Sequence, residues 1–288
     1  MALGYYELTV GKQNDGTTLK TFLRKECGIS ARSMTVLKYA GMGVTRRGEE
    51  IRAHDILYAG DVVIIQLPEE KSGITPVEGA LDILLEDRYL LLVNKPADMP
   101  VHPTKIHQTD TLANLVAAYQ QRRGEDYTFR ALNRLDKDTS GCVLIAKDRI
   151  AYSLMQPTVR KTYVAVCEGE ISESGTVDMP IGLSDNSRIV RCIREDGDRA
   201  VTHYQPIKVA NGHTLLELWL ETGRTHQIRC HMSSIGHPLA GDDLYGGSLE
   251  HIARQALHCR DIRFTHPVSR EEIYVTTQIP SEFLKIIN

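Results

Sequence analysis

The chain has 288 residues, of which 25% are charged and 42% hydrophobic, with a formal net charge of −3. This composition is typical of a globular protein, and the length allows one large core and a small accessory domain. No apolar run approaches the roughly 20 residues that a membrane span needs, and residues 1–16 lack the basic-then-apolar pattern of an export signal. Six dispersed cysteines without a Cys-x-x-Cys pair argue against a disulfide framework or zinc knuckle, so we expect a cytoplasmic protein without a metal.

Basic residues gather in two islands of this mildly acidic chain. Residues 20–47 contain seven basic residues and one acidic residue, and residues 130–163 contain seven basic and three acidic residues. Each island could be a solvated surface, but two in one chain indicate a partner with a phosphate backbone.

The first part of the chain predicts a small α/β unit. Apolar spacing predicts a helix over 18–27, ended by Gly28, and Ser30 is the predicted cap of a second helix over 31–39. A tight hairpin is expected at 44–51 around Gly48, followed by a strand over 61–67. The polar stretch that follows contains two prolines and two glycines, which indicates a linker.

The remaining chain is rich in strands, with helices interspersed in no regular strand–helix alternation. Strands are predicted at 81–87, 89–93, 142–146, 162–166, 214–220 and 272–278, and helices at 111–122 and, capped by Thr225, at 226–235. This order favours an α+β fold with a mixed, mostly antiparallel central sheet and flanking helices.

Asp136 stands out within the segment Asn133-Arg-Leu-Asp-Lys-Asp-Thr-Ser-Gly141. It precedes a turn signal and then a fully apolar run, so its carboxylate is expected at the junction of a loop and a buried strand. An aspartate before a turn often only binds nearby backbone N–H groups, and this segment alone favours that structural role. The flanking Arg134 and Lys137 favour the ionised carboxylate.

Several separated segments, in one order, resemble the RluA-type pseudouridine synthases over about residues 80–280. They are the Asp136 segment, Leu90-Leu-Leu-Val-Asn-Lys-Pro-Ala97, Pro100-Val-His-Pro103, Lys161-Thr-Tyr-Val-Ala-Val-Cys-Glu-Gly169, Thr222-Gly-Arg-Thr-His-Gln-Ile-Arg-Cys-His231, Gly236-His-Pro-Leu-Ala-Gly-Asp242, Leu257-His-Cys259 and Phe264-Thr-His-Pro267. The resemblance departs at Asn133, where the family usually has histidine, and between Lys147 and Lys161, a segment about two helical turns shorter than usual.

The resemblance implies isomerisation of uridine to pseudouridine in structured RNA, without a cofactor. It places Asp136 at the essential aspartate, Tyr163 at the tyrosine that packs on the target ring and Arg229 at the basic partner of the aspartate. It likewise places Arg134 at an arginine implicated in extruding the base and Ile228 at an apolar pocket residue. His226, Gln227 and His231 receive no chemical role. The carboxylate could attack C1′ of the ribose or remove a sugar proton, and either role needs the anion.

The N-terminal elements resemble the S4 RNA-binding module, most closely in Ala59-Gly-Asp-Val-Val-Ile-Ile65. We therefore expect an S4-like RNA-binding domain at 1–68, a linker at 69–79 and a pseudouridine synthase catalytic domain at 80–288. The expected partner is RNA, ribosomal RNA in preference to transfer RNA, and the expected state is a monomer. Two alternatives remain: a non-catalytic RNA-binding or ribosome-assembly factor, and a carboxylate-dependent hydrolase, for which no second carboxylate is evident.

Overall fold

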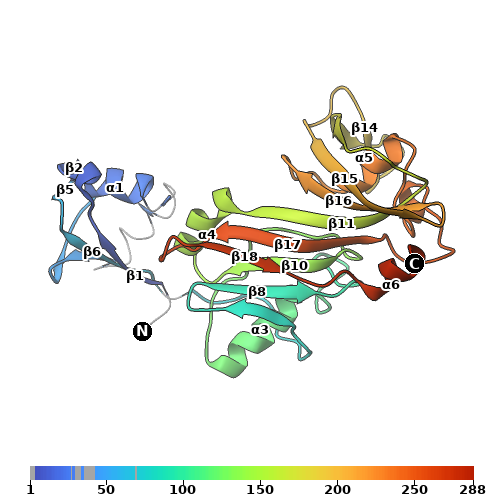
Figure 1. Ribbon diagram of the computed structural model, residues 1–288. Coiled ribbons are helices and arrows are strands. Elements are labelled where there is room, and N and C mark those ends of the chain that lie inside the picture. The colour runs from blue at the N-terminus through green and yellow to red at the C-terminus, as the bar shows by residue number, and fades with distance from the viewer. Residues whose placement is uncertain (1–3, 27, 30–33, 36–42, 69) are drawn as a thin grey trace.

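The computed structural model describes residues 4–26, 28–29, 34–35, 43–68 and 70–288 (Figure 1). The N-terminal region forms a four-stranded antiparallel sheet in the order β1-β6-β3-β4, with a two-stranded pair β2-β5 beside it. The elements of this region are β1 (Tyr5–Thr9), a 3₁₀ turn (Lys12–Asn14), β2 (Thr17–Thr18), α1 (Leu19–Lys25), β3 (Val44–Arg46), β4 (Glu49–Glu50), β5 (Ile56–Leu57) and β6 (Val62–Gln66).

The predicted first helix, hairpin and strand of this region are confirmed. Thr18 caps α1 by accepting a hydrogen bond from the Thr21 backbone N–H, and the apolar face of the helix is buried. The hairpin turns through Arg47 (φ 54°) and Gly48 (φ 84°), two left-handed residues whose twist suits a two-residue β turn. The predicted helix over 31–39 lies outside the described residues, apart from residues 34–35, which are helical.

The second sheet has ten strands and runs through the middle of the molecule (Figure 1). Eight strands follow the order β12-β15-β16-β11-β17-β10-β8-β7, while β18 pairs with β17 and β9 with β10. Their bounds are β7 (Ile83–Glu86), β8 (Leu90–Lys95), β9 (Arg130–Ala131), β10 (Ser140–Ala146), β11 (Arg160–Glu168), β12 (Gly175–Asp178), β15 (Val201–Ala210), β16 (His213–Leu220), β17 (Leu257–Thr265) and β18 (Glu272–Thr276). A separate hairpin pairs β13 (Ile181–Leu183) with β14 (Arg191–Ile193).

Strands β10 and β17 form the one parallel pair among the described strands, and they meet beside the Asp136 segment. Ser140 lies opposite His258, and Gly141 opposite Cys259. Gly141 has φ 113°, and a Cβ added there would lie 2.2 Å from the carbonyl oxygen of Cys259, so this close approach requires glycine. All other strand pairs are antiparallel, which confirms the predicted α+β fold with a mixed, mostly antiparallel sheet.

Helices flank this sheet, and one of them differs from its prediction at the N-terminal end. They are α3 (Leu112–Arg123), α4 (Arg149–Met155), followed by a 3₁₀ turn (Gln156–Thr158), α5 (Gln227–Ser234) and α6 (Ser281–Ile286). The cap of α5 is His226, not Thr225 as predicted. The reason is the Gln227 side chain, whose oxygen accepts hydrogen bonds from the Thr222 hydroxyl and the Arg224 N–H and so holds the preceding turn itself.

The N-terminal region is packed against the start of α4 through buried contacts. The Tyr6 hydroxyl lies 2.8 and 2.7 Å from the two oxygens of Asp148, which also caps α4. Ile150 of α4 belongs to the apolar cluster of the N-terminal region. Glu70 pairs with Arg130 and Arg149 at the same boundary. The two parts are therefore in direct contact in this structure.

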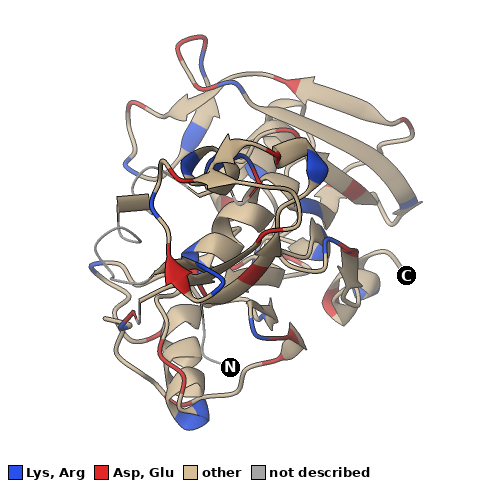
Figure 2. Cartoon of the chain, turned by 90° about the vertical axis from the view of Figure 1, so that its left-hand side faces the viewer, with Lys and Arg blue, Asp and Glu red and all other residues tan. Residues whose placement is uncertain are grey.

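Basic and acidic positions are distributed over the whole chain, as the cartoon in Figure 2 shows. In the described part of the chain, no helix is long and apolar enough to cross a membrane.

Candidate active site

The loop that carries Asp136 is held from several sides. The Asn133 amide donates to the Cys142 carbonyl (2.8 Å) and accepts from the Leu144 N–H (2.9 Å), so it ties the loop start to β10. The buried Lys95 ammonium donates to three carbonyl oxygens, including that of Lys137 at 3.0 Å. The loop is thus positioned by long-range hydrogen bonds from β8 and β10 rather than by its own turn alone.

Asp136 faces Arg229 of α5, as the sequence resemblance implied. The Arg229 Nη1 lies 3.3 Å from the Asp136 Oδ2. Arg229 makes a closer, two-point pair with Asp242, at 2.7 Å through Nε and 2.8 Å through Nη2, and its guanidinium carbon lies 4.9 Å from the Tyr245 ring centroid. Burial opposes the charge of Arg229, but the hydrogen bonds and charge of Asp242 outweigh it and raise the pKa of Arg229. Asp136 therefore lies beside a guanidinium that is fixed in place and fully charged.

Tyr163 and Ile228 complete the wall of a small pocket beside Asp136. Tyr163 is 6% exposed and projects from β11, and Ile228 is 3% exposed on α5. Burial raises the pKa of Tyr163 well above its usual range, so its ring meets the pocket as a neutral phenol. The hollow itself has a volume of only about 60 Å³.

Arg134 also lines this pocket, but it is an exposed side chain. Its neighbour Leu135 is buried and packs in the main core. The alternation places Leu135 as an anchor and leaves the guanidinium of Arg134 at the rim, where a polyanion can reach it.

Three residues of the site were not predicted from the sequence: Asp242, Tyr245 and His226. Asp242 lies in one of the segments that resemble the family, but no local sequence pattern predicts that it pairs with a residue thirteen positions earlier. His226 lines the pocket, with its Nε2 3.8 Å from the Asp136 Oδ2 and its Nδ1 3.0 Å from the Tyr245 hydroxyl. His231 lies away from the pocket, where its ring bonds the Thr202 hydroxyl and the Met179 carbonyl.

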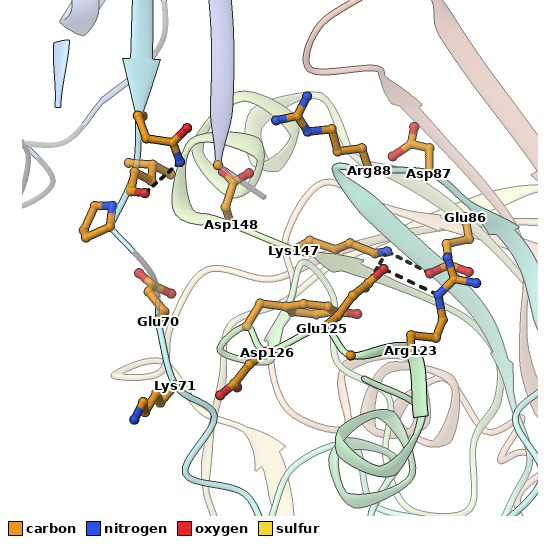
Figure 3. Close-up of a pocket in the computed structure, with 16 residues that line it drawn as sticks. Glu70, Lys71, Glu86, Asp87, Arg88, Arg123, Glu125, Asp126, Lys147 and Asp148 are labelled. Carbon is orange, nitrogen blue, oxygen red and sulfur yellow. Dashed lines mark hydrogen bonds and ion pairs between the residues drawn. The ribbon is translucent and has the colours of Figure 1, made fainter. Parts of the chain in front are cut away.

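A larger hollow of about 830 Å³ lies at the other end of β10, between the N-terminal region and the ten-stranded sheet. Figure 3 shows Lys147 pointing between Glu86 and Glu125, at 2.7 and 3.0 Å. The ionisable side chains lining it carry more acids than bases, and several are already paired with one another. This hollow is therefore poorly suited to a polyanion, and the chemistry is expected at the smaller Asp136 pocket.

Comparison with known proteins identifies the family. A family model described as "RNA pseudouridylate synthase" matches residues 89–234, which include Asp136, Tyr163 and Arg229. The chain is 40% identical over 272 residues to the "Uncharacterized RNA pseudouridine synthase YjbO" of Bacillus subtilis, covering 91% of this chain and 95% of that protein. It is 36% identical over 238 residues to the "Ribosomal large subunit pseudouridine synthase D" of Escherichia coli K12, covering 76% and 73%.

A solved structure shares the fold. "Human RNA Pseudouridylate Synthase Domain Containing 1" superposes with a TM-score of 0.56 at 28% identity, covering 69% of this chain and 83% of that one. The chain belongs to the RNA pseudouridine synthases, isomerases that act on RNA.

Proposed function

We propose that this protein converts uridine to pseudouridine in ribosomal RNA of the large subunit, with Asp136 as the essential carboxylate. The observation that carries the proposal is the Asp136–Arg229 contact of 3.3 Å in a pocket lined by Tyr163 and Ile228. The named large-subunit activity of the Escherichia coli relative supports the choice of RNA.

The reaction requires the target base to leave its stack, at a cost of a few kcal/mol. Arg134, exposed at the rim, is suited to occupy the space left in the RNA and to hold the backbone. The Tyr163 ring offers an aromatic face to the base, and Ile228 offers an apolar wall, which together replace part of the lost stacking.

Asp136 then acts as an anion close to the ribose. Either attack on C1′ or removal of a sugar proton requires the ionised carboxylate, and the guanidinium of Arg229 lies beside it as a counter-ion. The N1–C1′ bond breaks, the base turns and the C5–C1′ bond forms. The hydrogen at C5 leaves to solvent and N1 gains one, so the reaction needs neither an oxidant nor a group donor, and we propose no cofactor or metal.

We further propose that residues 1–68 form an S4-like RNA-binding domain, joined by the linker 69–79 to the catalytic domain 80–288. The N-terminal sheet with its short helix and the exposed basic face of α1 support this division. We propose that the protein acts as a monomer in the cytoplasm, where ribosomal RNA is available.

The test is a map of pseudouridines in total cellular RNA, made with and without this protein. We expect one or more sites in large-subunit ribosomal RNA to be modified only when the protein is present. Dependent sites confined to transfer RNA would overturn the proposed substrate. An unchanged map, together with RNA binding, would favour a non-catalytic assembly factor.

A further inference from the structure

His226 occupies an unusual backbone position at the edge of the Asp136 pocket. It is the N-cap of α5 with φ 55° and ψ 22°, in the left-handed region. A residue other than glycine in the left-handed region carries backbone strain on the order of 1 kcal/mol or more. Such strain tends to persist at functional sites. The conformation directs the imidazole into the pocket, where its Nε2 lies 3.8 Å from the Asp136 Oδ2.

The hydrogen bonds around Tyr245 favour one of the two imidazole nitrogens of His226 as the carrier of the proton. The Arg191 backbone N–H donates to the Tyr245 hydroxyl oxygen at 2.9 Å, so that oxygen already accepts a hydrogen bond. We assign the Tyr245 hydroxyl as the donor to His226 Nδ1, at 3.0 Å, because the other partner of that hydroxyl is itself a donor. With Nδ1 accepting, the neutral ring must carry its proton on Nε2, the nitrogen that faces the pocket.

Burial favours the neutral form of the His226 ring, and charged groups from four parts of the chain face it. Asp136 comes from the loop before β10, Arg229 from α5, Asp242 from the segment after it and Arg191 from β14. Burial lowers the pKa of His226, Arg229 and Arg191 lower it further, and Asp136 and Asp242 raise it, with a net decrease. The distance of 3.8 Å is too long for a hydrogen bond to Asp136, and in the described part of the chain Nε2 has no other hydrogen-bond acceptor. A directed donor therefore remains available inside the pocket.

We propose that His226 donates this Nε2–H to a carbonyl oxygen of the flipped uracil and stabilises the base as it departs from the ribose. When the N1–C1′ bond breaks, its electron pair moves into the base, and the negative charge is shared with the carbonyl oxygens. A fixed neutral donor beside the scissile bond stabilises that charge without first requiring a proton. The inference rests on the proposed uridine isomerisation and adds a substrate-contacting residue to it.

The primary test measures tritium release from an unmodified large-subunit ribosomal RNA transcript whose uridines are tritiated at C5. We expect His226→Phe, which keeps a ring but removes both nitrogens, to lower kcat about 100-fold with KM changed less than about threefold. His226→Gln carries an amide N–H near the position of Nε2, and we expect it to recover most of that loss. The matched control is His203→Phe, because His203 stacks on Trp219 outside the pocket, and it should keep the wild-type kcat.

Thermal unfolding of each variant separates this role from a structural one. Equal losses of kcat in His226→Phe and His226→Gln, or a kcat of His226→Phe within threefold of wild type, would overturn the inference. Tyr245→Phe gives a second check, because it removes the hydroxyl that fixes the tautomer while His226 stays. We expect it to lower kcat about tenfold, and an unchanged kcat would contradict the tautomer argument.

Thio-substituted substrates identify the acceptor once the target uridine is mapped. A thiocarbonyl is a poor hydrogen-bond acceptor, so replacing the correct oxygen should remove most of the difference between wild type and His226→Phe. If neither the 2-thio nor the 4-thio transcript reduces that difference, a base carbonyl is not the partner and the inference fails. A wild-type protein that releases no tritium from any RNA would instead overturn the proposed function.

Discussion

At the scale of single residues, Arg229 depends on Asp242 for its position. The guanidinium is buried and makes two hydrogen bonds to Asp242, while its contact with Asp136 is longer. Removing one partner of a buried pair leaves a charge without compensation, which typically costs about 3–5 kcal/mol.

We predict that Asp242→Asn lowers the free energy of unfolding by about 2–4 kcal/mol and reduces kcat more than tenfold. The neutral amide cannot hold the guanidinium at two points, so Arg229 no longer faces Asp136 in one orientation. Urea unfolding and tritium-release kinetics measure the two effects. Asp243→Asn is the matched control, since the adjacent Asp243 is exposed. Equal changes in the free energy of unfolding and in kcat for the two variants would contradict this role for Asp242.

The site residues that could be predicted from the sequence lie in segments that resemble the family. The structure places three of them, Asp136, Tyr163 and Arg229, around one pocket. Asp242, Tyr245 and His226 could not be found in this way. Their positions depend on a left-handed cap and on pairings across the fold, and neither leaves a local pattern in the chain. The role of the Asn133 side chain could not be predicted either, because its two hydrogen bonds to β10 depend on how the loop packs against that strand.

At the scale of elements, His258 links the parallel strands that frame the site. Its ring bonds the Ser140 hydroxyl of β10 and the Thr277 hydroxyl, each at 2.8 Å, and it is 3% exposed. Burial, together with the nearby Arg254, lowers the pKa of His258 to about 4 from an ordinary value of 6.5. The folded protein therefore holds this imidazole neutral at pH values where the unfolded chain binds a proton.

We predict a loss of stability of up to about 3 kcal/mol from this histidine between pH 6.5 and pH 4. A lowered pKa in the folded state means that the stabilisation is complete above 6.5 and is lost as the pH falls toward 4. Urea unfolding of wild type and His258→Gln at pH 7, 5.5 and 4.5 isolates the contribution, because His258→Gln should show a shallower decline. His54→Gln, at an 80% exposed side chain, should decline like wild type. Parallel declines for all three proteins would show that His258 does not titrate in this way.

Elements with strong periodicity were predicted from the sequence, while those defined by distant pairing were not. The continuous apolar run of β10 and the capped helix α3 were both located correctly. Strand β15 was missed, since its residues alternate poorly and Pro206 lies at an irregularity in its pairing with β16. The parallel alignment of β10 and β17 joins segments more than a hundred residues apart, so no local pattern could reveal it.

At the scale of the whole molecule, the N-terminal region contributes a basic surface that is distant from the Asp136 pocket. Lys20, Arg24 and Lys25 are exposed on α1, and Figure 1 shows this helix at the opposite end of the molecule from α5. Each phosphate contact that a protein makes contributes just under one unit to the salt dependence of RNA binding.

We predict that replacing Lys20, Arg24 and Lys25 together by Gln weakens RNA binding and makes the negative slope of log K against log salt shallower by about 2–3. The kcat at saturating RNA should stay unchanged, because the pocket is not altered. Filter binding at several salt concentrations, with tritium-release kinetics, measures both. The control variant carries Gln in place of three exposed basic residues outside the N-terminal region, Lys208, Arg263 and Lys285. An equal loss of slope in the control would show that α1 has no special part in RNA binding.

In the proposed reaction, Asp136 performs the chemistry at the ribose. The most direct test compares wild type with Asp136→Asn for tritium release from C5-tritiated ribosomal RNA, together with RNA affinity. We predict that wild type releases tritium from its target uridines, whereas Asp136→Asn releases none above background and binds the RNA with an affinity within about threefold of wild type. Release by Asp136→Asn at the wild-type rate would contradict the central claim.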